Sequence, residues 1–349
     1  MIGAIIGDIV GSRFEWHNIK TKDFELFHGR CHPTDDSVMT LAIAKAVLEY
    51  KQGKGDLSEL AIKYMQELGN RYPHAGYGKS FKGWLFAENP QPYNSCGNGS
   101  AMRVSPCGFA AETMEEVIAM SEAVTKVTHN HPEGMKGAKV VALAVYLAMQ
   151  HCIMPEIKEI LNGYYKVDFT LDDIRADYKF DSSCQGTLPV ALAAFYESKN
   201  FEDAIRNAIS IGGDSDTIAA ITGAIAEAYY GVPDNLRTSA VKFLYPDELE
   251  ILNSFENIYI PKKQPDESVH RVIIDDIREK EDREIIEHFL AIKNIIRSKC
   301  SRCDSSGCLG CIYSSGEMTV EIDKLAQKIL RDGHCSREYV AKQLKAFED

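Results

Sequence analysis

The 349-residue sequence predicts an all-α protein, and three observations favour this class. Apolar residues recur every three or four positions through most of the first 260 residues, which is helical spacing. Start and stop signals frame several of these stretches; the run that ends at Tyr230, for example, is followed by a glycine and then a proline. No segment shows the convincing two-residue alternation of a half-buried strand. We therefore expect a compact helical bundle with a small, helical C-terminal appendage.

The composition is ordinary for a globular protein, with 45% hydrophobic and 26% charged residues. No apolar run is long enough to span a bilayer, and the N-terminus lacks the basic region of a signal peptide, so we expect a cytoplasmic protein without a membrane partner. The net charge of −12 argues against general nucleic-acid binding, because a phosphate backbone would be repelled. Of the ten cysteines, the five scattered through apolar stretches are expected to be reduced, buried thiols.

The first helix is predicted over residues 1–16 and carries a stripe of glycines at intervals of four, Gly3, Gly7 and Gly11. Each glycine costs about 1 kcal/mol of helix propensity relative to alanine, so a close packing partner or a ligand is expected. Asp8, Ser12 and Glu15 would share one face of this helix. The face is either a solvated polar surface or part of a site. Glu15 stands between two aromatic residues, and burial there would raise its pKa.

Two clusters of acids and hydroxyls each open a predicted helix. The first is Thr34-Asp35-Asp36-Ser37, before an apolar run, and the second is Gly213-Asp214-Ser215-Asp216-Thr217, before another. The backbone N–H groups and the dipole of a helix N-terminus tolerate negative charge. Carboxylate and hydroxyl oxygens suit hard cations, and neither cluster contains the histidine or cysteine that favours zinc. The clusters look like two halves of one metal site, although either alone could be a helix cap with a spare acid.

Further helices are expected from the same spacing, over residues 37–51, 57–69, 113–128, 135–150, 186–198, 201–210 and 218–230, with shorter pieces within 156–180. Residues 70–98, rich in Gly, Pro and Tyr, predict a long loop with short helical pieces. At its end, Gly97-Asn98-Gly99-Ser100 could turn backbone N–H groups towards an anion or a sugar, or form an ordinary turn. His129 and His131 are equally open between ligand binding and simple packing or capping.

After residue 262 the composition becomes charge-dense, which predicts an appendage over residues 263–349 beside a main domain of residues 1–262. The appendage contains two Cys-x-x-Cys pairs, formed by Cys300, Cys303, Cys308 and Cys311. Such pairs can bind Zn²⁺ or an iron–sulfur cluster. The gap of four residues between the pairs is shorter than usual, so reduced thiols in a loop are an equal alternative.

Five motifs follow one another in a recognisable order: Gly7-Asp8-Ile9-Val10-Gly11-Ser12-x-x-Glu15, Thr34-Asp35-Asp36-Ser37, Gly97-Asn98-Gly99-Ser100, His129-x-His131 and Gly212-Gly213-Asp214-Ser215-Asp216-Thr217. Together they resemble the ADP-ribosylglycohydrolase family, which includes dinitrogenase reductase-activating glycohydrolase and the ADP-ribosyl-acceptor hydrolases. The resemblance covers residues 1 to about 260. It implies an orthogonal helical bundle that hydrolyses the bond at C1″ of an ADP-ribosyl group, using a binuclear Mg²⁺ or Mn²⁺ centre.

The resemblance also implies roles by position. The metal ligands would be Thr34, Asp35, Asp36, Asp214, Asp216 and Thr217, with Asp216 a candidate to bridge the ions. Catalysis would involve Glu15, as general acid or base, with Asp35 and Asp36. The substrate-binding residues would be Ser12, Gly97, Asn98, Gly99, Ser100 and His131. Ser37 stands where many members have a second threonine, and its hydroxyl is kept.

The partner implied is an ADP-ribosylated protein or another ADP-ribosylated acceptor, whose linkage the sequence does not reveal. Two other functions stay open at this point. One is an ADP-ribose-binding or nucleotide-binding protein without efficient catalysis. The other is a phosphoester hydrolase that uses the same binuclear centre.

Overall fold

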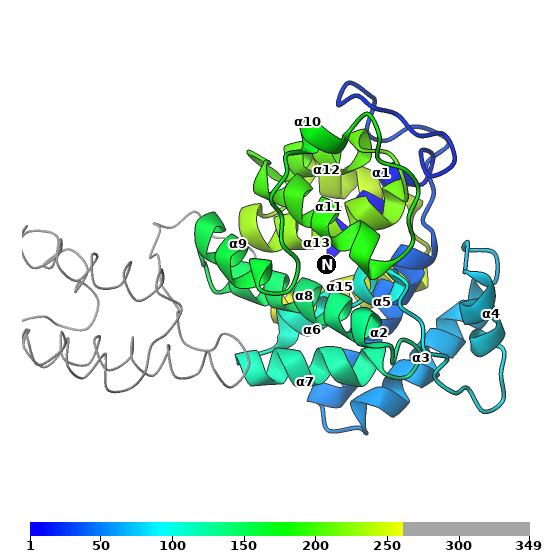
Figure 1. The fold of residues 1–349 in the computed structure, drawn as a ribbon. Coiled ribbons are helices and arrows are strands. Elements are labelled where there is room, and N and C mark those ends of the chain that lie inside the picture. The colour runs from blue at the N-terminus through cyan, green and yellow to red at the C-terminus, as the bar shows by residue number, and fades with distance from the viewer. Residues whose placement is uncertain (261–349) are drawn as a thin grey trace, which may run out of the picture. The chain divides into compact units, whose positions relative to one another are not determined.

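The computed structural model describes residues 1–260, and these form a bundle of helices (Figure 1). Apart from one isolated bridge between Gly97 and Ser183, the described residues contain no β-structure. The predicted all-α class is confirmed. The elements are α1 (Ile2–Gly11), α2 (Asp35–Lys51), α3 (Leu57–Arg71), α4 (Lys79–Leu85), α5 (Gly99–Met102), α6 (Ser105–Ala110), α7 (Met114–Thr125), α8 (Pro132–Met149), α9 (Met154–Asn162), α10 (Leu171–Ile174), α11 (Cys184–Tyr196), α12 (Phe201–Ser210), α13 (Ser215–Tyr230), α14 (Asp234–Ala240), the 3₁₀ helix η1 (Val241–Phe243) and α15 (Pro246–Tyr259).

The predicted appendage and its four-cysteine cluster lie outside the described residues, so both stay predictions. Within the described part, α6, α14, η1 and α15 were not predicted. No helix between residues 1 and 260 combines the length and the apolar character that crossing a membrane requires.

The first helix ends earlier than predicted, at Gly11 instead of near residue 16. Beyond it the backbone turns, with the N–H of Phe14 donating to the carbonyl of Gly11 at 2.8 Å. Ser12 ends the helix, and its hydroxyl donates to a carbonyl of the last turn. The prediction that Asp8, Ser12 and Glu15 share one helical face is therefore wrong, because Glu15 lies in the turn after the helix.

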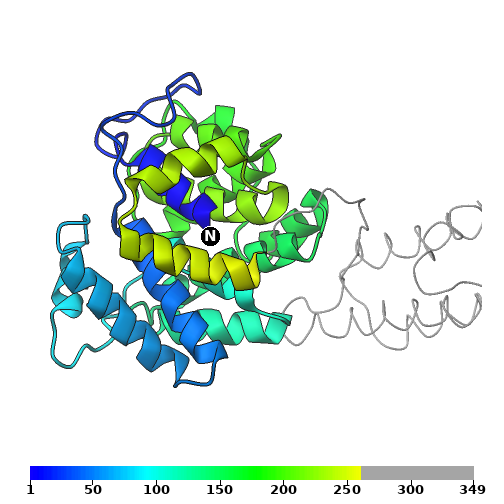
Figure 2. The same ribbon diagram turned by 180° about the vertical axis from the view of Figure 1, so that it is seen from behind.

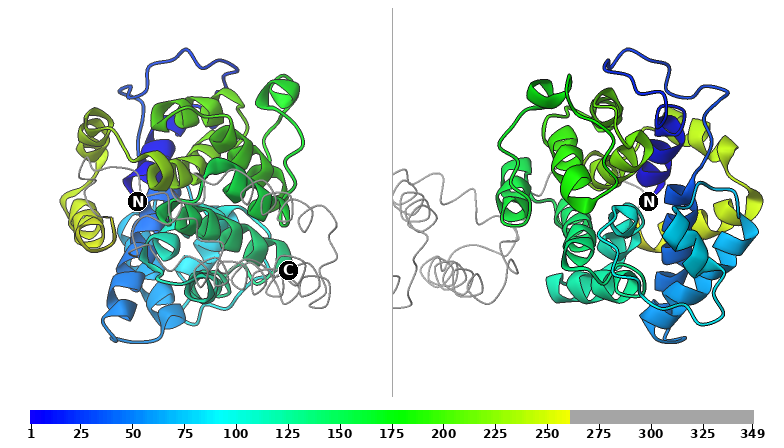
Figure 3. Two further views of the ribbon diagram at one scale, coloured as in Figure 1. Left: turned by 90° about the vertical axis from the view of Figure 1, so that its left-hand side faces the viewer. Right: turned by 45° about the vertical axis from the view of Figure 1, so that its right-hand side comes forward.

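Helices α1 and α13 form the centre of the bundle, and every residue of α1 is buried. The views in Figures 2 and 3 show the blue N-terminal helix among green and yellow helices from the later half of the chain. The glycine stripe explains the contact. A methyl group at Gly7 would overlap the backbone carbonyl of Ala219, and one at Gly11 would lie 2.5 Å from the Cα of Asp216. Close packing by the stripe therefore aligns the C-terminal end of α1 with the start of α13.

Candidate metal centre and substrate site

Asp8, near the end of α1, holds the first turn of α2 in place. Its buried carboxylate accepts hydrogen bonds from the backbone N–H of Thr34 at 2.8 Å and from the Thr34 hydroxyl at 2.7 Å. It also accepts from the N–H of Ser37 at 3.0 Å and from the Ser37 hydroxyl. A carboxylate is the group suited to this position, because it has acceptor sites for all four donors. The first acid cluster is thus fixed against α1.

The start of α13 brings the second cluster to the first. Asp214 is the N-cap residue of α13, and Asp216 lies in its first turn. The backbone N–H of Thr217 donates to Asp216 at 3.0 Å, while its hydroxyl donates to the carboxylate of Asp36 at 3.1 Å. Two clusters about 180 residues apart in the sequence therefore touch directly, and both lie at helix N-termini as the sequence predicted.

Two overlapping groups of three carboxylates result from this packing. In one, oxygens of Asp8, Asp36 and Asp216 all lie within 4.8 Å of one another. In the other, the same limit holds for Glu15, Asp214 and Asp216. Asp216 belongs to both groups, which places it between the two halves of the site. None of these five acids forms an ion pair within residues 1–260.

Burial raises the pKa of every acid in this cluster, and repulsion by neighbouring acids of the cluster adds to the rise for Glu15, Asp35, Asp36 and Asp216. Burial is the largest cause for Asp8, Asp36, Asp214 and Asp216. Burial, and then the charge of Asp8, raise the pKa of Asp35 to about 8. For Glu15 the value rises to about 7, through burial and then the charges of Asp214 and Asp8. The charges of Asp214 and Asp8 therefore act on Glu15 even though it lies beyond the helix.

The donor set fits hard divalent cations. It consists of carboxylate and hydroxyl oxygens, and buried carboxylates without a cation are costly. One oxygen of Asp36, its Oδ1, is buried and has no hydrogen-bond partner among the described residues. A cation beside this oxygen would satisfy it and would offset the repulsion within the cluster. The acids that the sequence singled out therefore make a chemically reasonable site for Mg²⁺ or Mn²⁺.

Asn98 connects the glycine-rich loop to the acids. Its side-chain amide donates to Asp214 at 2.7 Å and to the hydroxyl of Thr187 at 2.9 Å. The loop itself is held by the bridge between Gly97 and Ser183, whose flanking hydrogen bonds measure 2.8 and 2.9 Å. Asn98, predicted to bind substrate, therefore also orients a candidate metal ligand.

Three other predicted substrate-binding residues have hydrogen bonds within the framework. The Ser12 hydroxyl donates to a carbonyl of α1, and the buried Ser100 hydroxyl donates to a carbonyl at the start of α8 at 2.9 Å. His131 is the N-cap of α8, and its Nδ1 accepts a backbone N–H at 3.1 Å. Their contacts with a substrate stay predictions.

His129 lies beside the glycine-rich loop. It is buried, its Nδ1 is 2.7 Å from the hydroxyl of Thr128, and a methyl group at Gly99 would lie 3.5 Å from its Nε2. Burial, followed by the charge of Arg103, lowers its pKa well below the ordinary value. His129 therefore packs against the glycine-rich loop as a buried part of the framework.

Sequence reasoning missed two positioning residues. Asp8 was noted within the polar face and the first motif but was given no role, although its place between the glycines of α1 marks a buried position. Asn18 left no local signal, because it stands in an irregular stretch. Its amide nonetheless clamps Gly213, accepting the N–H at 2.8 Å and donating to the carbonyl at 2.9 Å. Gly212 and Gly213 have φ angles of 70° and 71°, a region that favours glycine.

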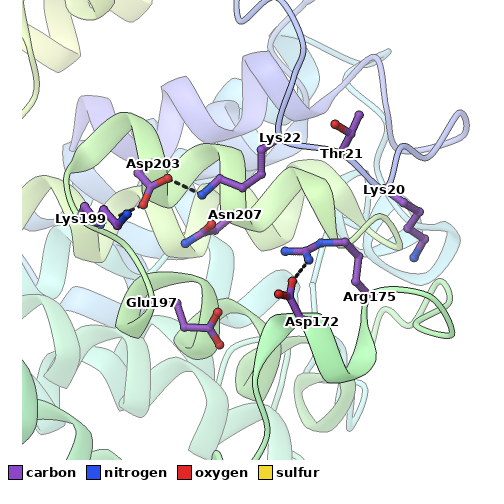
Figure 4. A pocket seen from close by; sticks show the side chains of 9 residues that line it. All are labelled: Lys20, Thr21, Lys22, Asp172, Arg175, Glu197, Lys199, Asp203 and Asn207. Carbon is purple, nitrogen blue, oxygen red and sulfur yellow. Dashed lines mark hydrogen bonds and ion pairs between the residues drawn. The ribbon is translucent and has the colours of Figure 1, made fainter.

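A surface pocket of about 290 Å³ contains none of the predicted site residues (Figure 4). Its lining is charged and largely paired, with Lys22 bound to Asp203 and Arg175 bound to Asp172. The remaining lining residues are Lys20, Thr21, Glu197, Lys199 and Asn207. Because no member of the acid cluster faces it, this pocket is not the candidate catalytic site.

Comparisons with known proteins agree with these motifs. The family model described as ADP-ribosylglycohydrolase matches residues 1–259. The ADP-ribosylhydrolase ARH3 of Xenopus tropicalis is 27% identical over 316 residues, which cover 69% of this chain and 89% of the relative. The ADP-ribosylarginine hydrolase Tri1 of Pseudomonas putida (strain GB-1) is 28% identical over 271 residues, or 66% of this chain and 70% of the relative.

A solved structure shares the fold. It is described as an ADP-ribosylglycohydrolase-related protein complex, and it matches with a TM-score of 0.55 at 22% identity. The match covers 74% of this chain and 94% of that one. At this identity the likeness concerns the arrangement of helices alone.

Proposed function

The chain belongs to the ADP-ribosylglycohydrolase family, and we propose that it hydrolyses the bond at C1″ of an ADP-ribosyl group with the help of two divalent cations. The enzyme is a glycohydrolase that acts on ADP-ribosylated substrates and removes ADP-ribose from an acceptor. The cations and their number are the part of the proposal that goes beyond the family relationship.

The observation that supports the metal centre best is the convergence of unpaired carboxylates from three chain segments. The residues that would hold the cations are Thr34, Asp35, Asp36, Asp214, Asp216 and Thr217, and Asp8 is close enough to join them. When bound, two such ions orient hydroxyl groups of a sugar and lower the pKa of a water molecule. Mg²⁺ and Mn²⁺ both suit this oxygen-only donor set.

Glu15 would transfer the proton during hydrolysis. It is only partly buried and lies at the edge of the cluster, next to Asp214 and Asp216, where a substrate can reach it. With its pKa raised to about 7, the side chain can hold or release a proton near neutral pH. We assign it to proton transfer at the water or at the leaving atom, around an oxocarbenium-like transition state.

The glycine-rich loop would bind the substrate. Gly97, Asn98, Gly99 and Ser100 would approach the distal ribose and the diphosphate, and Ser12 and His131 would also contact the substrate. Two facts support this: the loop is tied to the acid cluster through Asn98, and small residues there leave room for a ligand close to the backbone.

Product analysis tests this function. The full chain, incubated with an ADP-ribosylated protein and Mg²⁺ or Mn²⁺, should release ADP-ribose and the unmodified acceptor, both identified by mass. Release of AMP would instead show a phosphoester hydrolase. Tight binding of ADP-ribose by calorimetry, without turnover at any divalent ion, would show a binding protein.

A further inference from the structure

Trp16 and Phe180 form an exposed aromatic pair. Their side chains belong to residues that are 72% and 45% exposed, and the rings stack with centroids 5.3 Å apart and planes inclined by 16°. Of the large hydrophobic residues exposed within residues 1–260, these are the two that stack on each other. Large apolar rings left in water cost hydration free energy, and joined exposed rings mark a contact surface.

The pair is attached to the candidate site from both sides. Trp16 directly follows Glu15, and its indole N–H hydrogen-bonds the Glu15 carboxylate. On the other side, Phe180 precedes Asp181, whose carbonyl accepts the hydroxyl of Thr187 at 3.0 Å. Thr187 in turn accepts the amide of Asn98. The platform of Trp16 and Phe180 therefore starts at the proposed proton-transfer residue and extends into solvent.

On the basis of the proposed function, we propose that this platform binds the acceptor side chain and favours an arginine guanidinium over a hydroxyl-linked acceptor. For the bond at C1″ to reach Glu15, the ribose must enter among the buried acids. The acceptor belongs to a protein that stays outside, so it leaves the reacting bond towards solvent. The exposed platform beside Glu15 lies where that side chain has to pass.

The chemistry of the platform selects a flat cation. A guanidinium group is planar and always charged, and it stacks on aromatic faces, with tryptophan the strongest partner. The carboxylate of Glu15, next to Trp16 in the sequence, has no ion-pair partner among the described residues, and its ionised form would add attraction for a cation. A serine side chain offers neither a planar surface nor a charge.

The test compares Trp16→Ala, Trp16→Phe and Phe180→Ala with the wild-type full chain. The readouts are kcat/KM on peptides carrying ADP-ribosyl-arginine or ADP-ribosyl-serine and on ADP-ribosylated DNA, together with the affinity for free ADP-ribose by calorimetry. Phe243→Ala is the matched control, because Phe243 stacks on Phe27 with centroids 6.0 Å apart, outside the proposed platform.

We expect wild type to prefer the arginine-linked peptide and Trp16→Ala to lose roughly 2- to 30-fold in kcat/KM on it, the range of a cation–π contact. Trp16→Phe should keep most of the activity, since it keeps a ring but loses the N–H. The affinity for ADP-ribose should stay within about twofold in every variant, as for the Phe243→Ala control, since a stacking contact with the acceptor is absent from ADP-ribose itself.

Several results would overturn the platform. An equal loss on arginine- and serine-linked peptides, or a matching loss of ADP-ribose affinity, would place the pair against the nucleotide or show that it only orients Glu15. A preference for ADP-ribosylated DNA, lost in Trp16→Ala, would assign the platform to a nucleobase. If wild type cleaves no substrate, both the proposed function and the role of the platform are wrong. If wild type is active but Trp16→Ala is equally active, only the role of the platform is wrong.

Discussion

Asp8 and Asp36 lie in one buried cluster, yet their hydrogen bonding differs. Asp8 accepts four hydrogen bonds from the start of α2, so its charge organises the fold. Asp36 has one oxygen bonded to Thr217 and one without a partner among the described residues. An acid with satisfied oxygens supports structure, whereas an unsatisfied buried oxygen is a cost that function must explain.

This difference predicts opposite effects of two conservative substitutions on stability. In EDTA, Asp36→Asn should raise the free energy of unfolding by roughly 0.5–2 kcal/mol, because it removes a buried charge at a functional site. Asp8→Asn should lower it by roughly 1–3 kcal/mol, because an amide nitrogen cannot accept the bonds to Thr34 and Ser37. Chemical denaturation at pH 7 measures both. Destabilisation by Asp36→Asn as large as that by Asp8→Asn would contradict this division of roles.

At the scale of elements, the contact between α1 and α13 determines where the acids of the candidate metal centre lie. The sequence predicted a close packing partner for the glycine stripe. The spacing of glycines along one helix does not identify which other helix packs against them. The prediction that the first helix continues to residue 16 was wrong, because hydrogen bonds around Ser12 and Phe14 favour a turn over another helical turn. Asn18 was unpredictable for a related reason: its partner Gly213 is 195 residues away in the sequence.

The glycine contact predicts a strong position dependence for Gly→Ala. Gly7→Ala should lower the free energy of unfolding by roughly 3 kcal/mol, because the added methyl group meets the rigid backbone of Ala219. Gly83→Ala is the control: Gly83 lies inside α4 with nothing within 4 Å of the added methyl group, so a gain of roughly 0.5–1 kcal/mol is expected. Equal effects in thermal unfolding would show that α1 and α13 do not need the stripe.

At the scale of the whole molecule, local patterns predicted the helical class, most long helices and the two acid-bearing helix starts. Short elements such as α6 and α14 were missed because a few residues carry too little periodicity to separate them from loops. The distances within the site could not be predicted, since they depend on how α1, α2 and α13 pack. The resemblance carried by the motifs implied that the two acid clusters meet, and the fold shows how Asp8, Asn98 and Asn18 hold them there.

The clustered acids predict that stability without divalent ions falls as the pH rises. The pKa of Asp35 is raised from 3.8 to about 8, so the folded protein binds more protons than the unfolded chain between these values. The free energy of unfolding therefore decreases as the pH rises through this window. The stabilisation that Asp35 contributes is fully present only below about pH 4. In EDTA, Tm should fall between pH 5.5 and 8, less steeply for Asp35→Asn. Added Mg²⁺ or Mn²⁺ should raise Tm more at pH 8 than at pH 5.5; an equal rise at both would mean that the cation binds elsewhere.

The central claim is that ADP-ribose release depends on cations held by acids from both helix starts. Its most direct test follows ADP-ribose release from an ADP-ribosylated protein by wild type and Asp216→Ala, first in EDTA and then after Mg²⁺ or Mn²⁺ is restored. Wild type should be inactive in EDTA and recover with the cation, while Asp216→Ala, which lacks the carboxylate shared by both groups of acids, should stay inactive in both conditions. Undiminished turnover in EDTA, or full activity of Asp216→Ala, would contradict it.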